Sequence, residues 1–157
     1  MGLEDKLQKL SKTKTPKKVD SEKVLFEWKT EVEKTLKKTM DWLKSYQDKG
    51  LLKAMEKEKT IREEVLGEYK VKQLEYEFGK FRLVFEPMGR NILGAWGRID
   101  VYLRGSKTDK YVLILLGEKF ETSKWYLSSF QDKSKRTDFN KKNLENLIED
   151  WIDKNTF

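Results

Sequence analysis

Hydrophobic residues recur at steps of three and four between positions 21 and 49, the spacing that gathers side chains on one face of a helix. Charged residues fill most of the remaining positions, so the helix is expected to bury one face and expose the other. Asp20 or Ser21 can cap its start, and Gly50 suits the left-handed turn that ends many helices. At 1.5 Å per residue the helix would be roughly 42 Å long, which exceeds one face of a small sheet. Its apolar stripe consists of Leu25, Trp28, Val32, Leu36, Met40, Leu43 and Tyr46.

The next segment, residues 51–66, is expected to form a second, shorter helix that ends at Gly67. The charged run 56–59 interrupts the apolar positions of this segment and weakens the helical pattern. Those apolar positions are Leu51, Leu52, Met55, Ile61, Val65 and Leu66.

From Tyr69 onwards the period of the hydrophobic positions changes from about 3.6 residues to 2, which predicts β-strands. We expect five strands between residues 69 and 128. The loops between them are too short for the crossover that parallel strands need, so the sheet should be an antiparallel meander. Gly79-Lys80 has the composition of a two-residue hairpin turn. The segment 111–116 is apolar without alternation, which is typical of a central strand covered on both faces.

Residues 138–153 predict a closing amphipathic helix, with Asp138 as its cap. The expected fold class is therefore α+β, with a long N-terminal helix, a shorter second helix, a five-stranded antiparallel meander and a C-terminal amphipathic helix. We expect a basic, loosely ordered arm over residues 1–19, followed by a single domain over residues 20–157.

The chain of 157 residues contains neither histidine nor cysteine. This absence excludes imidazole acid–base chemistry, thiolate nucleophiles, disulfides and zinc sites built from Cys or His. The remaining carboxylates, lysines and tyrosines form no intact catalytic motif, so the sequence favours a non-catalytic protein without a cofactor. No apolar run approaches the ~20 residues that span a membrane, and the start lacks the apolar core of a signal peptide, so we expect a cytoplasmic location.

The chain carries a net charge of +7, which is spread along it except at the C-terminal end, where acids outnumber lysines. Residues 1–20 hold six lysines and three acids, whereas residues 138–157 hold three lysines and five acids. A positive field favours an anionic partner such as nucleic acid, and the alternative is that the charge only maintains solubility.

Arginine and aromatic residues alternate along the third expected strand, and a bulge near Gly97 would bring Trp96 onto the same side as Arg98. Such a sheet face can stack bases while its cations meet phosphates. The alternative is that a helix covers this face and the rings belong to the core. Nucleic acid, or a protein complex bound to nucleic acid, is the favoured partner. The candidate contacts, including those of the basic arm, are Lys12, Lys14, Lys17, Lys18, Arg82, Trp96, Arg98, Tyr102, Arg104 and Lys124.

A second hypothesis is a protein-interaction or assembly module that uses the apolar stripe of the long helix. If the sheet covers only half of that stripe, the rest can meet a partner helix. The alternative is a helix packed wholly on its own sheet, and the sequence leaves the oligomeric state open. The candidate interaction residues are Trp28, Leu36, Met40 and Leu43.

A third hypothesis is a diverged metal-dependent nuclease centred on Asp100. The run 98–101, before a hairpin and an apolar strand, resembles the first half of the motif of restriction-endonuclease-type enzymes. The run 117–119 lacks the second half, because no acid stands two residues before Lys119. Hairpin register would place Asp100 opposite roughly Ile114, where that family needs a second metal ligand. The alternative role of Asp100 is to pair with a nearby cation: Arg98, Arg104 or Lys110.

Overall fold

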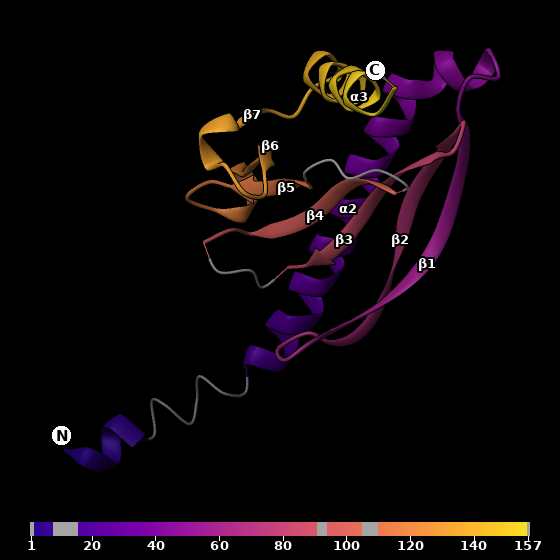
Figure 1. Ribbon diagram of the computed structural model, residues 1–157. Coiled ribbons are helices and arrows are strands. Elements are labelled where there is room, and N and C mark those ends of the chain that lie inside the picture. Colours follow the sequence, from indigo (N-terminus) through magenta and orange to yellow (C-terminus); the bar gives the residue numbers. More distant parts are fainter. Residues whose placement is uncertain (1, 8–15, 91–93, 105–109, 157) are drawn as a thin grey trace.

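The computed structural model describes residues 2–7, 16–90, 94–104 and 110–156, with the backbone alone for residues 16–20. Within them a long helix, a seven-stranded sheet and a second helix follow one another along the chain, with a separate helical turn at residues 3–7 (Figure 1). The elements are α2 (Pro16–Asp48), β1 (Lys53–Glu63), β2 (Gly67–Phe78), β3 (Phe81–Gly89), β4 (Gly97–Arg104), β5 (Tyr111–Leu116), the 3-10 turn η1 (Phe120–Thr122), β6 (Lys124–Ser129), the 3-10 turn η2 (Lys133–Lys135), β7 (Thr137–Asp138) and α3 (Lys141–Thr156).

The sheet is an antiparallel meander in which the strands lie side by side in chain order, from β1 to β7. The protein is therefore α+β, but the prediction of five strands is wrong, because the sheet has seven. The two further strands are β7 and β1. The second of these replaces the shorter helix that was predicted over residues 51–66.

The charged run 56–59, which weakened the helical pattern, lies in the middle of β1. Its glutamates meet lysines of β2 diagonally across the pair of strands, with Lys70 to Glu58 at 3.2 Å and Lys72 to Glu56 at 3.5 Å. Opposite charges in such positions stabilise a strand pair. Since β1 is an edge strand, its charges also disfavour pairing with the sheet of another molecule.

Both long helices differ from their predicted bounds at the start. Helix α2 begins at Pro16, five residues before the predicted start at residue 21, because proline fits the first turn of a helix, where no backbone donor is needed. Helix α3 begins after Asn140, whose side chain accepts a hydrogen bond from the backbone of Asn143 at 2.8 Å. Asn140 therefore caps this helix in place of the predicted Asp138.

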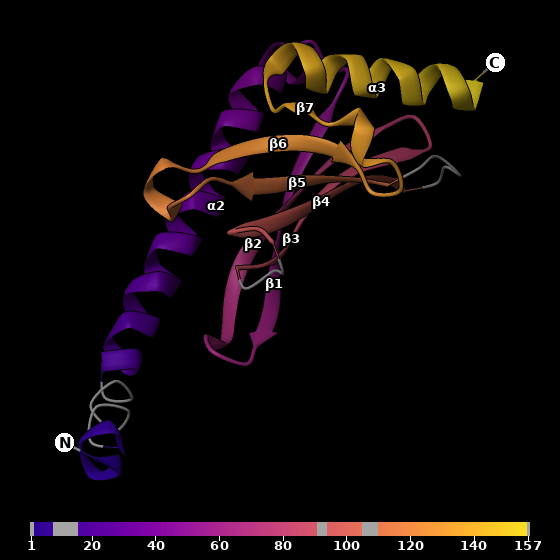
Figure 2. The ribbon, with the colours of Figure 1, turned by 90° about the vertical axis from the view of Figure 1, so that its left-hand side faces the viewer.

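Both helices pack on one face of the sheet, which we call the inner face (Figures 1 and 2). From α2, the ring of Trp28 lies directly over Gly97 and 6.2 Å from the ring of Trp125. From α3, the ring of Trp151 meets that of Tyr111 edge-on at 5.7 Å. The opposite, outer face carries the other alternating residues of β3 and β4, and no helix covers it within the described part of the chain.

No helix among the described residues is both long and apolar enough to cross a membrane.

Candidate nucleic-acid interface on the outer sheet face

The arginines and the lysine predicted to contact nucleic acid from the sheet each have a carboxylate partner. Arg98 contacts Asp100 at 2.6 Å, and Lys124 contacts Asp138 at 3.4 Å. Arg82 and Arg104 lie directly opposite each other on β3 and β4 and share one carboxylate, that of Glu75, at 3.4 and 4.0 Å. Much of the positive charge predicted for this face is therefore neutralised within the protein.

Three carboxylates, those of Glu75, Glu86 and Asp100, form a row on the outer face of β2, β3 and β4. Glu75 and Asp100 have no exposed surface, and Glu86 is partly buried. Burial alone would raise the pKa of Glu86, but hydrogen bonds from Lys59 at 2.6 Å and Tyr102 at 2.8 Å lower it below its ordinary value. A buried carboxylate destabilises the fold unless it is paired, so the cations on this face are needed for the stability of the sheet.

Trp96 does not join Arg98 and Tyr102 in the predicted row of stacking groups. It lies in the bend before β4, and its ring contacts the guanidinium of Arg90, 4.9 Å from the ring centroid. Its indole nitrogen donates to the carbonyl oxygen of Gly117 at 2.7 Å. The expectation that a bulge at Gly97 would bring this ring onto the outer face is therefore wrong.

The predicted interaction stripe of the long helix lies inside the protein. Trp28 has no exposed surface, Leu36 and Leu43 are 5% and 1% exposed, and Met40 packs against the same core. The nitrogen of the Trp28 ring also donates to the hydroxyl of Tyr69 at 3.0 Å. This part of α2 thus packs on its own sheet, the alternative that the sequence left open.

The side chains of the lysines in the predicted arm lie outside the described part of the structure. Lys12 and Lys14 lie outside the described residues, and Lys17 and Lys18 lie in the first turn of α2, where only the backbone is described. Their contact with a ligand stays a prediction.

A hollow of about 380 Å³ opens on the outer face where β4, β5 and β6 lie side by side, and we call it the outer hollow. Its floor is apolar, with Val112, Ile114 and Leu116 from the outward positions of β5. This strand was predicted to be covered on both faces, but no helix or strand of the described residues packs over this side, where the hollow lies. The complete lining is Gly94, Ala95, Arg98, Val112, Ile114, Leu116, Ser128, Ser129, Phe130, Lys133 and Arg136.

Phe130 stands at the rim of the outer hollow with about half of its surface exposed. Its backbone nitrogen donates to the carbonyl oxygen of Lys110 at 2.9 Å, which ties it to the start of β5. The side chains of Arg98 and Lys110 lie 5.1 and 5.6 Å from its ring centroid, and both also contact Asp100. The ring is therefore held in place by cations that a buried carboxylate positions.

Two further cations, Lys133 and Arg136, line the hollow from the segment that follows β6. No carboxylate of the described residues lies within ion-pair distance of either one. Asp132 fixes this segment by accepting hydrogen bonds from the backbone and hydroxyl of Ser134, which lower the pKa of its carboxyl group. Ser129 in turn accepts a bond from the backbone of Asp132 at 3.2 Å.

These residues were missed in the sequence, because the segment after the predicted fifth strand has no hydrophobic period. The available signal was the basic run 133–136, which follows an aromatic residue at the end of an apolar strand. In the structure the run lies beside the hollow, where an exposed ring, an apolar floor and two cations without a carboxylate partner among the described residues come together. Such a surface can stack a planar ring and hold an anion next to it.

Asp100 lies opposite Val112 in β5 rather than the predicted Ile114, so its neighbour is still hydrophobic. Its two oxygens contact Arg98 at 2.6 Å and Lys110 at 2.5 Å, which is the cation-pairing role considered from the sequence. Among the described residues no group of three or more acidic side chains is placed to hold a metal ion. Comparison of the chain with protein-family models, curated proteins and solved structures finds no match.

Proposed function

We propose that the protein is a non-catalytic module that binds single-stranded nucleic acid in the outer hollow. The observation that carries the proposal is the exposed ring of Phe130 beside an apolar floor and two cations, Lys133 and Arg136, without carboxylate partners among the described residues. A base stacks on the ring, and the phosphates next to it meet the cations.

A single strand fits this arrangement better than a duplex. The stacking face of a base is free only when the base is unpaired, and one exposed ring offers one such stacking site. Recognition through stacking and phosphate contacts predicts binding with little sequence preference and with strong dependence on salt. The basic arm supplies further phosphate contacts through Lys12, Lys14, Lys17 and Lys18. A nucleic-acid ligand is compatible with the cytoplasmic location expected from the sequence.

A nuclease centred on Asp100 has less support than binding. A divalent ion would have to displace Arg98 and Lys110, which already contact both carboxylate oxygens. The assembly hypothesis for the buried stripe of α2 has less support as well, because a partner helix would need the core to open.

The test is a fluorescence-anisotropy titration of a labelled thymidine oligonucleotide at several salt concentrations. We expect a Lys133→Gln/Arg136→Gln variant to bind more weakly and to reduce the salt slope by about 1.4, since each lost phosphate contact on a single strand is worth about 0.7. A Phe130→Ala variant should lose about 1–3 kcal/mol of binding free energy, the contribution of one stacked base.

The matched control is Lys37→Gln/Lys44→Gln, which removes the same charge from exposed positions of α2, on the helix side of the protein. Its effect on affinity should be small, because these lysines lie away from the outer hollow. Equal losses for both double variants would mean that net charge alone attracts the oligonucleotide. That result, or unchanged binding by Phe130→Ala, would overturn the proposed site.

A further inference from the structure

A smaller hollow of about 270 Å³ opens beside the outer hollow, and we call it the end hollow because it lies where β5 ends. Its lining is Gly94, Ala95, Trp96, Leu116 and Gly117. Three of these residues, Gly94, Ala95 and Leu116, also line the outer hollow, so the two hollows adjoin. A Cβ at Gly94 would meet no atom of the described residues within 4 Å, which leaves open space at the border between them.

The outward side chains of β5 lead from Phe130 to the end hollow. Phe130 is tied to the start of this strand, since its backbone nitrogen donates to the carbonyl oxygen of Lys110 at 2.9 Å. At the other end, the backbone nitrogen of Trp96 donates to the carbonyl oxygen of Leu115 at 2.7 Å. The steps from residue 110 to residue 115 span about 17 Å, at about 3.4 Å per residue of an antiparallel strand. The apolar floor of the outer hollow therefore runs from one aromatic residue towards the other.

The ring of Trp96 is held in place at the end hollow by its neighbours. Its indole nitrogen donates to the carbonyl oxygen of Gly117 at 2.7 Å. The guanidinium of Arg90 lies 4.9 Å from its ring centroid and 4.8 Å from that of Phe120, and Arg90 is only 9% exposed. These contacts leave Trp96 partly exposed where it lines the hollow. A ring fixed in this way can stack a base with little loss of conformational entropy.

We propose that the single strand bound at Phe130 continues along β5 and stacks a second base on Trp96 in the end hollow. This inference rests on the proposed function, because it takes the same ligand and extends its path. Stacked nucleotides are about 3.4 Å apart, so a stacked strand needs about six of them to cover about 17 Å and contact both rings. No lysine or arginine among the described residues lines the end hollow, so the second contact adds stacking without a further phosphate contact.

The test compares a labelled thymidine trimer with a labelled thymidine decamer in fluorescence-anisotropy titrations. The trimer is too short to contact both rings and should stay beside Lys133 and Arg136. We expect Trp96→Leu to weaken binding of the decamer by about 5- to 150-fold, the contribution of one stacked base, and to leave binding of the trimer unchanged. The salt slope of the decamer should also stay unchanged, since no phosphate contact is lost.

A Trp96→Phe variant separates stacking from packing. Both variants lose the hydrogen bond to Gly117, but only the phenylalanine keeps an aromatic ring, so it should restore most of the affinity for the decamer. Quenching of the intrinsic tryptophan fluorescence by the decamer is a second readout, which does not depend on the folding of the leucine variant. This quenching should be largely lost in Trp96→Phe, because Trp28, Trp125 and Trp151 are at most 9% exposed.

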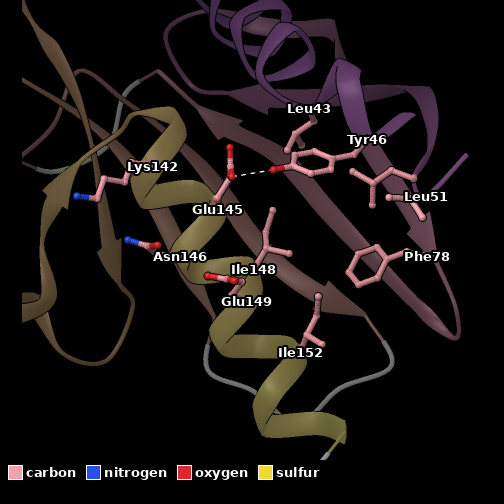
Figure 3. A pocket seen from close by; sticks show the side chains of 11 residues that line it. Leu43, Tyr46, Leu51, Phe78, Lys142, Glu145, Asn146, Ile148, Glu149 and Ile152 are labelled. Atoms are coloured by element: carbon pink, nitrogen blue, oxygen red, sulfur yellow. Dashed lines mark hydrogen bonds between the residues drawn. The ribbon is translucent and has the colours of Figure 1, made fainter. Parts of the chain in front are cut away.

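The matched control is Tyr46→Leu in a hollow of about 400 Å³ between α2 and α3 (Figure 3). Tyr46 is partly exposed, like Trp96, and its hydroxyl donates to Glu145 at 2.8 Å, so this variant also loses one ring and one hydrogen bond. Glu149 lines the same hollow, and the two carboxylates disfavour a nucleic-acid strand there. The variant should bind both oligonucleotides as wild type does, and a loss equal to that of Trp96→Leu would overturn the inference.

The Phe130→Ala variant distinguishes failure of this inference from failure of the proposed function. If Phe130→Ala weakens binding of both oligonucleotides and Trp96→Leu weakens neither, the second contact is wrong and the outer hollow stands. The second contact is also wrong if Trp96→Leu weakens the trimer as much as the decamer, or if Trp96→Phe binds the decamer no better than Trp96→Leu. If Phe130→Ala changes binding of neither oligonucleotide, the proposed function itself is wrong. Circular dichroism checks that each variant folds.

Discussion

The buried carboxylate of Asp100 holds two cations beside the outer hollow, and an Asp100→Asn variant tests what these cations do when they are released. The amide keeps the shape of the side chain and removes its charge. Asp100 has no exposed surface, but Arg98 and Lys110 are 25% and 40% exposed and can turn towards water. Losing one partner of a fully buried ion pair costs about 3–5 kcal/mol, so we expect about 2 kcal/mol less free energy of unfolding for this half-exposed set.

The same substitution should strengthen nucleic-acid binding while it weakens the fold. Arg98 and Lys110 flank the ring of Phe130, and without their counterion both can contact phosphates. Two new contacts on a single strand would steepen the dependence of log affinity on log salt by about 1.4. Anisotropy titrations across a salt series measure this slope, and urea unfolding followed by circular dichroism measures the stability of the same samples.

A Glu75→Gln variant provides the control, because it removes one charge from another fully buried carboxylate. Glu75 holds Lys57 and Arg82 at 3.4 Å, and none of these residues lines the outer hollow. Both variants raise the net charge by one, from +7 to +8, and both should be less stable. Only Asp100→Asn is expected to steepen the salt slope. An equal gain for both variants, or no gain for Asp100→Asn, would refute the assignment of the ligand to this hollow.

Three further predictions concern the fold. A Cβ at Gly97 would lie 2.3 Å from the ring of Trp28, so Gly97→Ala should lower the free energy of unfolding in urea by about 1–3 kcal/mol. The loss should be smaller in a Trp28→Phe background, and a Gly97→Ala variant that is more stable than wild type would contradict the prediction. Burial raises the pKa of Tyr76 to about 12, and its hydroxyl has no hydrogen-bond partner among the described residues. Tyr76→Phe should therefore change stability at pH 7 by less than about 1 kcal/mol and reduce the loss of stability that wild type shows between pH 10 and 12. Burial would raise the pKa of Glu86, but its hydrogen bonds from Lys59 and Tyr102 outweigh this effect and lower it. The ionised Glu86 therefore stabilises the fold above pH 4.5, and this stabilisation is lost as the pH falls through the lowered pKa. In a Glu86→Gln variant the melting temperature should depend less on pH below pH 4.5.

The elements that the sequence predicted well are those whose hydrophobic period is long and uniform. The stripe of α2 repeats over seven apolar positions, and the hairpin at Gly79 has both a period-two pattern and a glycine with positive φ. Strand β1 was taken for a helix from the spacing of its apolar positions, although the charged residues 56–59 weakened that pattern. Their partners in β2 decide the structure of this segment, and cross-strand pairing is a tertiary effect that no local pattern contains.

The sequence indicated part of the outer sheet face but not the outer hollow. The alternation of charged and aromatic residues in β4 correctly marked a face with a polar character, and Arg98 does line the outer hollow. The sequence could not show that Glu75 and Asp100, which lie on strands among the cations, would be buried and would neutralise them. It also gave no weight to the basic segment after β6, because a turn has no period to detect.

The buried carboxylates explain why the unpaired charge lies at one end of the uncovered face. A sheet with both helices on its inner face must present polar groups on the other side, and carboxylates in the middle of that side are stable only when cations cover them. Most of the arginines on β3 and β4 are used in this way, so they mainly stabilise the sheet. Neither Lys133 nor Arg136 contacts a carboxylate among the described residues, so their charge is available to an anion. In the proposed function, the ligand therefore lies where the fold leaves cations without carboxylate partners among the described residues. The comparison of Asp100→Asn with Glu75→Gln tests this proposal directly.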